Sequence, residues 1–230
     1  MQKQNSKKHG FTLAEILITL TVIGVVAALT IPTLLQNTNQ AELKTALKRD
    51  FADLSQATLS IKNDLGGSLV NAFPGEGLGS DALKNAYRGK LNYIKECGGT
   101  GSWGTSGNGA SADGCWHAAD GWQYLNGTKF SGTMTTPGLI LNNGTLMYLY
   151  ITSSSCSTLV GDYYRCGEIT FDVNGFKKPN TVGKDIFVAV ITNDGILPMG
   201  ARGYNDPDTS INGCYSTAYG YGCAAKYLYE

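Results

Sequence analysis

The sequence lacks an excess of charge, and it lacks the motifs on which most hydrolases and metal sites depend. Its 230 residues include 18 Lys and Arg and 18 Asp and Glu, so net charge gives no support to nucleic-acid binding. Only two histidines occur, His9 and His117, and no cysteines have the C-x-x-C spacing of a zinc site. The motifs G-x-S-x-G and H-E-x-x-H are also absent. We therefore expect a protein that is not an enzyme.

Charge is scarcest in one long stretch near the N-terminus. Residues 11–35 are predominantly apolar and contain one charged side chain, Glu15. As a helix they would span about 37 Å, enough to cross a bilayer with some tilt. The preceding Lys3, Lys7 and Lys8 predict that the N-terminus stays in the cytoplasm and the rest is exported. A carboxylate is costly in an apolar membrane helix, so Glu15 indicates a function beyond anchoring.

The residues around Glu15 form a specific pattern. A basic leader ends at Gly10, Phe11 follows it, Glu15 lies four residues after Phe11, and Pro32 lies within the apolar run. This combination resembles the class III signal of type IV prepilins and type II secretion pseudopilins. The resemblance covers about the first 35 residues, and Ala14 departs mildly from the larger aliphatic residue that the family more often has.

The resemblance implies a route of processing and assembly. A prepilin peptidase would cut after Gly10, and Phe11 would become the N-methylated first residue of the mature chain. Glu15 would then pair with the terminal amine of a neighbouring Phe11 while an inner-membrane platform assembles the subunits. Loss of the three leader lysines would leave the mature chain with a formal charge of −3.

The alternative is an ordinary secretory signal, with Ala27 and Ala28 near its cleavage site. Glu15 within the apolar segment argues against that interpretation. Gly24 and Pro32 are poor helix-interior residues, so we predict a helix kink at these positions. The resemblance adds that the stretch between them can lose helicity in a filament.

Beyond residue 36 the helical pattern continues in amphipathic form. Apolar residues recur at spacings of three, four and seven, and charged residues occupy the opposite face. These apolar positions are Leu43, Leu47, Phe51, Leu54, Ile61 and Leu65. We predict one helix over residues 11–65, about 80 Å long and ended by Gly66 and Gly67.

The rest of the chain predicts an α+β head, in which the helix packs on an antiparallel sheet as in pilins. Asn142, Asn143 and Gly144 give a hairpin signal of the type I′ kind. Strands are expected at 139–141, 145–152, 168–173 and 186–192, with a last short run ended by Pro198, and a short helix at 81–94. The expected domains are a cleaved leader (1–10), a transmembrane and polymerisation helix (11–35), its amphipathic continuation (36–66) and a globular head (67–230).

All six cysteines lie in the head. An even number in an exported segment indicates disulfides in an oxidising compartment, and six cysteines allow 15 connectivities. Proximity in sequence favours pairing Cys97 with Cys115, Cys156 with Cys166, and Cys214 with Cys223.

Asp172, Asn174 and Asp185 form a candidate calcium site, because oxygen ligands at alternate positions are followed by glycine. An EF-hand would need Glu at the position of Gly183, however, and Asp and Asn in a turn often bond to backbone amides instead. No other cofactor is expected.

A glycine-rich loop precedes Cys115. Its residues 99–104 match G-x-G-x-x-G, but no strand precedes them and no helix follows, so we reject a dinucleotide site. Trp103, Trp116 and Trp122 either contact a partner or, as is commoner for aromatic residues, pack beneath the loop.

The expected function is that of a structural subunit of a type IV pilus-like filament, formed by copies of this chain through the N-terminal helix. A type II secretion pseudopilin, or a minor or tip pilin that binds a surface or DNA, is the alternative. The expected partners are other subunits, the prepilin peptidase, the assembly platform and, before assembly, membrane lipid. The protein would reside in the inner membrane with its head outside, and then in a cell-surface pilus or periplasmic pseudopilus.

Overall fold

A computed structural model describes residues 11–74, 79–98, 116, 121–130, 137–203 and 213–230. The chain forms two compact units, Met1–Glu42 and Leu43–Glu230, called here the N-terminal unit and the head unit. Several predicted features lie outside the described residues: Gly10, the loop residues 99–104 with Trp103, Cys115 and His117.

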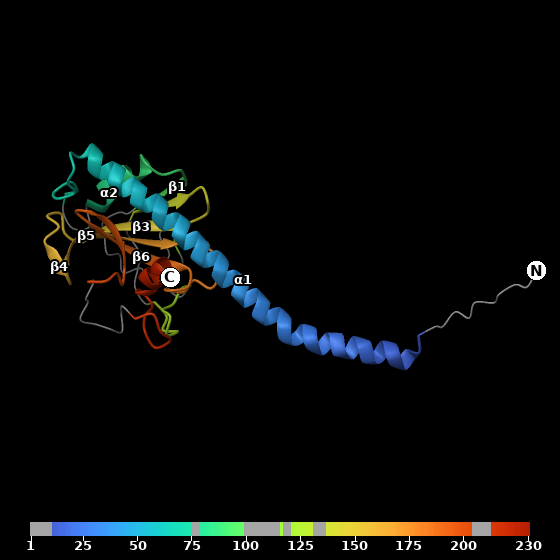
Figure 1. Cartoon of the computed structure of the whole chain (residues 1–230). Coiled ribbons are helices and arrows are strands. Elements are labelled where there is room, and N and C mark those ends of the chain that lie inside the picture. Colours follow the sequence, from blue (N-terminus) through green and yellow to red (C-terminus); the bar gives the residue numbers. More distant parts are fainter. Residues whose placement is uncertain (1–10, 75–78, 99–115, 117–120, 131–136, 204–212) are drawn as a thin grey trace, which may run out of the picture. The chain divides into compact units, whose positions relative to one another are not determined.

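Helix α1, Leu13–Asp64, has the single long run that the sequence predicts, with Pro32 inside it (Figure 1). Its C-terminal end has a defined cause. The Gly66 N–H donates to the Asn63 carbonyl, and the Gly67 N–H donates to the Lys62 carbonyl. Gly66 has a φ of 81°, in the left-handed region that favours glycine. These two bonds are those of a Schellman motif, which satisfies the last carbonyls of the helix.

In the head unit, the amphipathic stripe of α1 enters the core as predicted. Leu47, Leu54 and Ile61 are buried in the largest hydrophobic cluster, and Leu43 and Phe51 pack at its edge. Leu65 is the exception, because it follows the last helical residue and its side chain is 45% exposed.

The head unit contains a seven-stranded sheet in which all the paired strands are antiparallel. The order is β1-β2-β3-β5-β6-β7, with β4 pairing to β5. The strands are β1 Tyr93–Cys97, β2 Gly138–Leu141, β3 Leu146–Ile151, β4 Thr158–Val160, β5 Tyr163–Asp172, β6 Ile186–Thr192 and β7 Gly195–Pro198. Within the described residues, the head also contains the short helices α2 Gly79–Arg88 and α4 Cys223–Tyr229. The chain is thus an α+β protein with a pilin-like fold.

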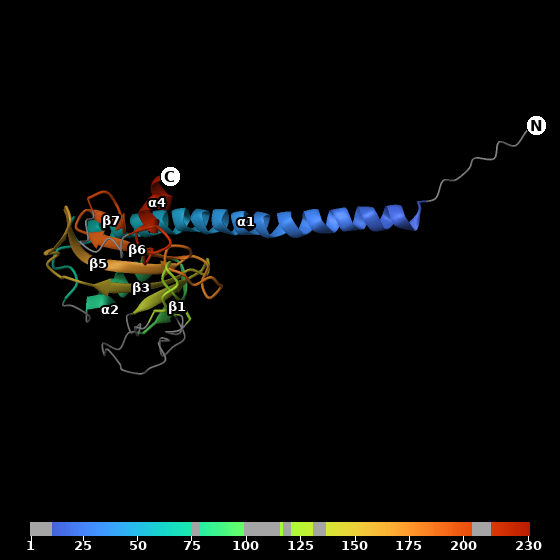
Figure 2. The same cartoon turned by 90° about the horizontal axis from the view of Figure 1, so that it is seen from below.

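Figure 2 shows strands β7, β6, β5 and β3 side by side in the head unit. The sheet they form is covered on both faces. One face packs on α1, α2 and α4, and together they form the main cluster. The other face packs on an aromatic cluster centred on Trp116 and Trp122. Strand β6 is buried at every position because its alternate side chains enter opposite clusters: Phe187 and Ala189 face the helices, and Ile186 lies with the tryptophans.

Two expectations about local structure are wrong. The helix predicted at 81–94 ends at Arg88, and β1 begins at Tyr93, because Tyr93 and the residues from Lys95 to Cys97 pair with β2. The hairpin turn is not of type I′, which would need positive φ at both Asn142 and Asn143. Instead Gly144 alone is left-handed, with a φ of 90°, and donates to the Leu141 carbonyl in a three-residue loop.

Two further features were not predicted from the sequence. Strand β5 begins at Tyr163 rather than 168, because it pairs there with β4. Helix α4 follows the last cysteine, where only a closed loop was expected.

Candidate functional site

The first turn of α1 is closed by a reciprocal pair of residues, Thr12 and Glu15. The Thr12 backbone N–H and its hydroxyl each donate to Glu15 Oε2 at 2.8 Å. In return, the Glu15 N–H donates to Thr12 Oγ1 at 3.3 Å. This is a capping box, which satisfies backbone donors that the start of a helix leaves unpaired. The carboxylate predicted to act in assembly therefore has a defined position at the positive end of the helix.

The N-terminal unit exposes its apolar side chains. Every Phe, Leu, Ile and Val from Phe11 to Leu35 is exposed, from 48% for Ile16 to 84% for Phe11. Among the described residues, α1 is the one helix long and apolar enough to cross a membrane, with a mean hydropathy of 2.3 in its most apolar window. An apolar surface of this extent is stable only in lipid or against other protein surfaces.

The threonines of this segment do not interrupt its apolar surface. Thr19 donates to the Ile16 carbonyl, and Thr21 donates to the Leu17 carbonyl. Thr30 and Thr33 form similar bonds one turn back, to Val26 and Leu29. Because these hydroxyls are satisfied within the helix, Glu15 carries the strongest polarity of the segment.

Residues 5–31 match the prokaryotic N-terminal methylation motif. This motif marks the type IV pilin and pseudopilin family. Searches of the curated proteins and of the solved structures returned no significant match. The chain is thus a prepilin-type protein with the general role of a pilin or pseudopilin, and members of the family are generally structural subunits without enzymatic activity. The motif implies processing by a prepilin peptidase, and with the apolar helix it indicates a membrane-anchored precursor.

Gly24 and Pro32 both lie within α1 of this pilin-like protein. Pro32 has no N–H to donate to the preceding turn, so the helix has a local weak point there. A Cβ at Gly24 would meet no other group, so no close contact in the described structure requires glycine. The kink at these positions stays a prediction.

The three residues of the candidate calcium site lie close in sequence but have other contacts. An Asp172 carboxylate oxygen accepts from the Asn174 N–H at 3.1 Å. The two oxygens of Asp185 accept from the backbone N–H groups of Asn180 and Thr181 at 2.7 and 2.6 Å. Both aspartates are fully buried. Their oxygens thus bind backbone amides, as in the turn interpretation, and no group of three His, Cys, Asp or Glu able to hold a metal occurs in the described residues.

Two of the predicted disulfides are present, Cys156–Cys166 and Cys214–Cys223. Cys97 is also disulfide-bonded. The first of these bridges closes the β4–β5 hairpin, and the second ties the start of α4 to the loop before it. The first bridge thus ties the loop before β4 to the central strand β5, and the second fixes the C-terminal helix.

The tryptophans within the described residues are buried in the protein, which agrees with the second of the two predicted alternatives, packing in the core. Trp116 and Trp122 are 4% and 2% exposed. Trp122 stacks on Phe130 with ring centroids 3.9 Å apart, and Trp116 packs edge-on against Tyr148. They serve as core residues on the sheet face opposite α1.

One charged residue of the head, Asp50, was not singled out from the sequence. It lies in the apolar stripe of α1, three residues after Leu47 and four before Leu54, where a charge is out of place. Its carboxylate is buried and accepts from Asn143 Nδ2, Thr145 Oγ1 and Arg49. The position of this charged residue within the apolar stripe indicates a buried polar contact, although it does not indicate the partner.

Proposed function

We propose that this chain is the subunit of a type IV pilus-like filament. It is made as a single-pass inner-membrane prepilin with the head outside, cleaved after Gly10 and N-methylated at Phe11. In this proposal residues 1–10 are the leader, 11–35 the transmembrane and polymerisation helix, 36–66 its amphipathic continuation and 67–230 the head. Copies pass from membrane lipid into the filament through an assembly platform.

One observation carries the proposal: an apolar helical segment whose Phe, Leu, Ile and Val side chains are all exposed, and whose first turn holds a carboxylate. Apolar packing is non-directional, so it brings the helices together without fixing their axial positions. A single acid on each helix can fix them, because a subunit added out of register leaves that charge unpaired in an apolar medium.

The natural partner for Glu15 is the amine that cleavage creates at Phe11. This cation would lie beside the positive end of its own helix, where it is disfavoured and needs a nearby anion. Attraction between unit charges about 4 Å apart is roughly four times stronger at an effective dielectric near 20 than in bulk water. In a subunit outside the filament, the Glu15 carboxylate accepts hydrogen bonds from the N–H and hydroxyl of Thr12. In the filament, the amine of a neighbour replaces this weaker partner.

Two measurements test this function. Mass spectrometry of the mature chain is expected to find a methylated N-terminus at Phe11, and a chain beginning near Leu29 would refute prepilin processing. Glu15→Leu is expected to insert and to be processed but to form no filaments in electron micrographs. Glu42→Leu, which removes an exposed acid of the same helix outside the apolar run, is the matched control and should assemble normally. Normal filaments from Glu15→Leu would exclude the charge-pair role.

Disulfides form in the periplasm and at the cell surface alike, so the bridged head fits both a surface pilus and a periplasmic pseudopilus, and the proposal is a surface pilus. Immunogold labelling of intact cells separates the two. Label along external shafts is expected, and label confined to opened cells would assign the chain to a secretion pseudopilus.

A further inference from the structure

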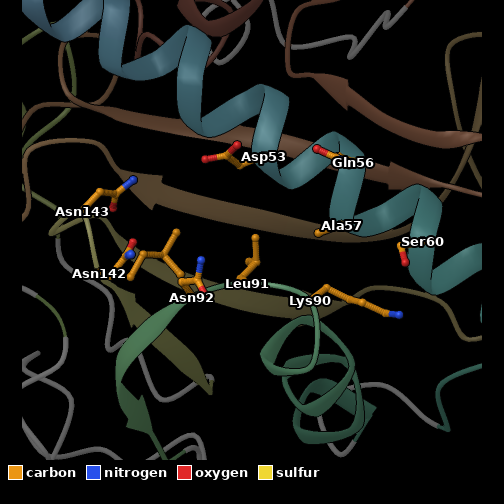
Figure 3. A pocket seen from close by; sticks show the side chains of 10 residues that line it. Asp53, Gln56, Ala57, Ser60, Lys90, Leu91, Asn92, Asn142 and Asn143 are labelled. Carbon is orange, nitrogen blue, oxygen red and sulfur yellow. The ribbon is translucent and has the colours of Figure 1, made fainter.

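A polar cavity of about 320 Å³ lies beside α1 in the head unit (Figure 3). Three segments far apart in sequence line it. Asp53, Gln56 and Ser60 come from α1, Asn92 from the segment between α2 and β1, and Asn142 from the β2–β3 turn. Its size is at the lower end of small-molecule sites, which suits one small ring better than an extended chain.

The cavity brings together hydrogen-bonding groups that the protein itself does not use. The side chains of Gln56, Asn92 and Asn142 make no hydrogen bond within the described residues. The neighbouring Asn143 is different, because it donates to Asp50 and accepts from the Thr145 N–H. The Asn142 N–H also donates to the Asn92 carbonyl at 3.1 Å, which holds these two walls together. The cavity therefore has three side-chain carboxamides available to bind a ligand, on walls that a backbone hydrogen bond holds together.

The charges at the cavity select against anions. Asp53 contributes a carboxylate to the wall, and the one cation of the lining, Lys90, is paired with Asp64 at 2.5 Å. A phosphate or carboxylate ligand would therefore meet an uncompensated negative charge. A divalent cation would find one carboxylate, too few for a protein site.

The remaining chemistry fits a neutral ligand rich in hydroxyl groups. Each carboxamide offers a donor and an acceptor side by side, which matches a pair of adjacent hydroxyls, and the Asp53 carboxylate accepts from hydroxyls. Leu91, Ala57 and Leu141 supply an apolar surface for the C–H face of a ring. We infer that this cavity binds a neutral sugar, one residue of a glycan. This activity goes beyond that of a filament subunit.

The test is a titration of the full-length chain, in a detergent without a sugar headgroup, with free glucose, galactose, mannose and N-acetylglucosamine. The methyl NMR signals of Leu91 and Leu141 report on the cavity. At least one neutral sugar is expected to shift them in a saturable manner, with millimolar affinity. Gln56→Glu and Asn92→Asp keep the side-chain shape but remove a donor, and each is expected to weaken binding about tenfold.

Asn85→Asp is the matched control. Asn85 is an exposed carboxamide on α2 outside the cavity, and its replacement adds the same negative charge. It should change the affinity by less than about twofold. The inference is refuted if no neutral sugar shifts these signals up to about 50 mM. Equal losses in Asn85→Asp and Asn92→Asp, or equally tight binding of glucose 6-phosphate, would also refute it.

Discussion

Thr145 donates a hydrogen bond to a carboxylate oxygen of Asp50 at 2.6 Å, between two buried side chains of the head. Asn143 donates to the other oxygen at 2.9 Å, and Arg49 approaches it at 2.8 Å. Asp50 is on α1, and its two hairpin partners lie in the turn after β2. This carboxylate therefore fixes the helix to the sheet, in a place where apolar packing alone would allow small shifts.

Replacing Thr145 with valine tests this contact. The variant leaves one oxygen of a buried carboxylate without its donor, so the free energy of unfolding should fall by about 1–3 kcal/mol. Urea denaturation of the full-length chain, followed by circular dichroism, measures the change. Thr128→Val is the control, because Thr128 is exposed, and its effect should be within about 0.5 kcal/mol. Equal stability of the two variants would show that the contact is not stabilising.

The free energy of unfolding should depend on pH through the titration of Asp50. Burial raises the pKa of this carboxyl above its ordinary value of 3.8, against the opposing effect of the bonds from Thr145 and Arg49. The folded state thus binds the proton more tightly than the unfolded state. The resulting stability is fully present below pH 3.8 and is lost as the pH rises through the raised pKa.

Asp50→Asn does not titrate at this position, so it isolates that contribution. Unfolding free energies of both proteins, measured from about pH 3 to pH 8, should show the wild type losing stability relative to the variant within that window. Above the raised pKa the difference should be constant. A difference that is flat throughout, or that slopes the other way, would show that folding does not raise the pKa of this carboxyl.

Gly66 should be intolerant of a side chain. Its φ of 81° is disfavoured for alanine, and since a Cβ there would meet no other group, the cost of Gly66→Ala is conformational alone. A loss of about 1–2 kcal/mol in unfolding free energy is expected. Gly89→Ala is the matched control, because Gly89 also follows a helix but lacks a positive φ. If both variants lose the same stability, the left-handed conformation is not the cause.

Thr12→Val should loosen the start of α1. The variant removes one donor to Glu15 and the acceptor of the Glu15 N–H. A lost N-cap costs about 1 kcal/mol, so amide hydrogen exchange in the first turn should be about fivefold faster in micelles. Thr19→Val serves as control, since the Thr19 hydroxyl bonds only to the Ile16 carbonyl. Unchanged exchange in Thr12→Val would mean that the capping box does not stabilise the turn.

The sequence predicted those parts of the fold in which local pattern and packing agree. The recurrence of Leu47, Leu54 and Ile61 predicted the buried face of α1, and Gly66 marked its end within one residue. The residues near Glu15 were sufficient by themselves to indicate the family. The family motif consists of residues that are consecutive in the sequence, so it can be recognised without knowledge of the fold.

What the sequence did not predict depends on residues that meet only in the fold. The pattern predicts a helix through Tyr93, although Tyr93 pairs with Leu141 of β2, because that pairing depends on a residue more than 40 positions later. The bonds of Asp50 to the hairpin and the cavity beside Gln56 have the same origin, since each combines α1 with the β2–β3 turn. The Thr12 and Glu15 capping box is different, because its signature, a threonine followed three residues later by a glutamate, is present in the sequence itself.

The placement of Trp116 and Trp122 provides a built-in optical probe. Both indoles lie on the sheet face opposite α1, and the helix-side cluster contains no tryptophan among the described residues. Ultraviolet emission from these two rings would therefore follow the loosening of one side of the head.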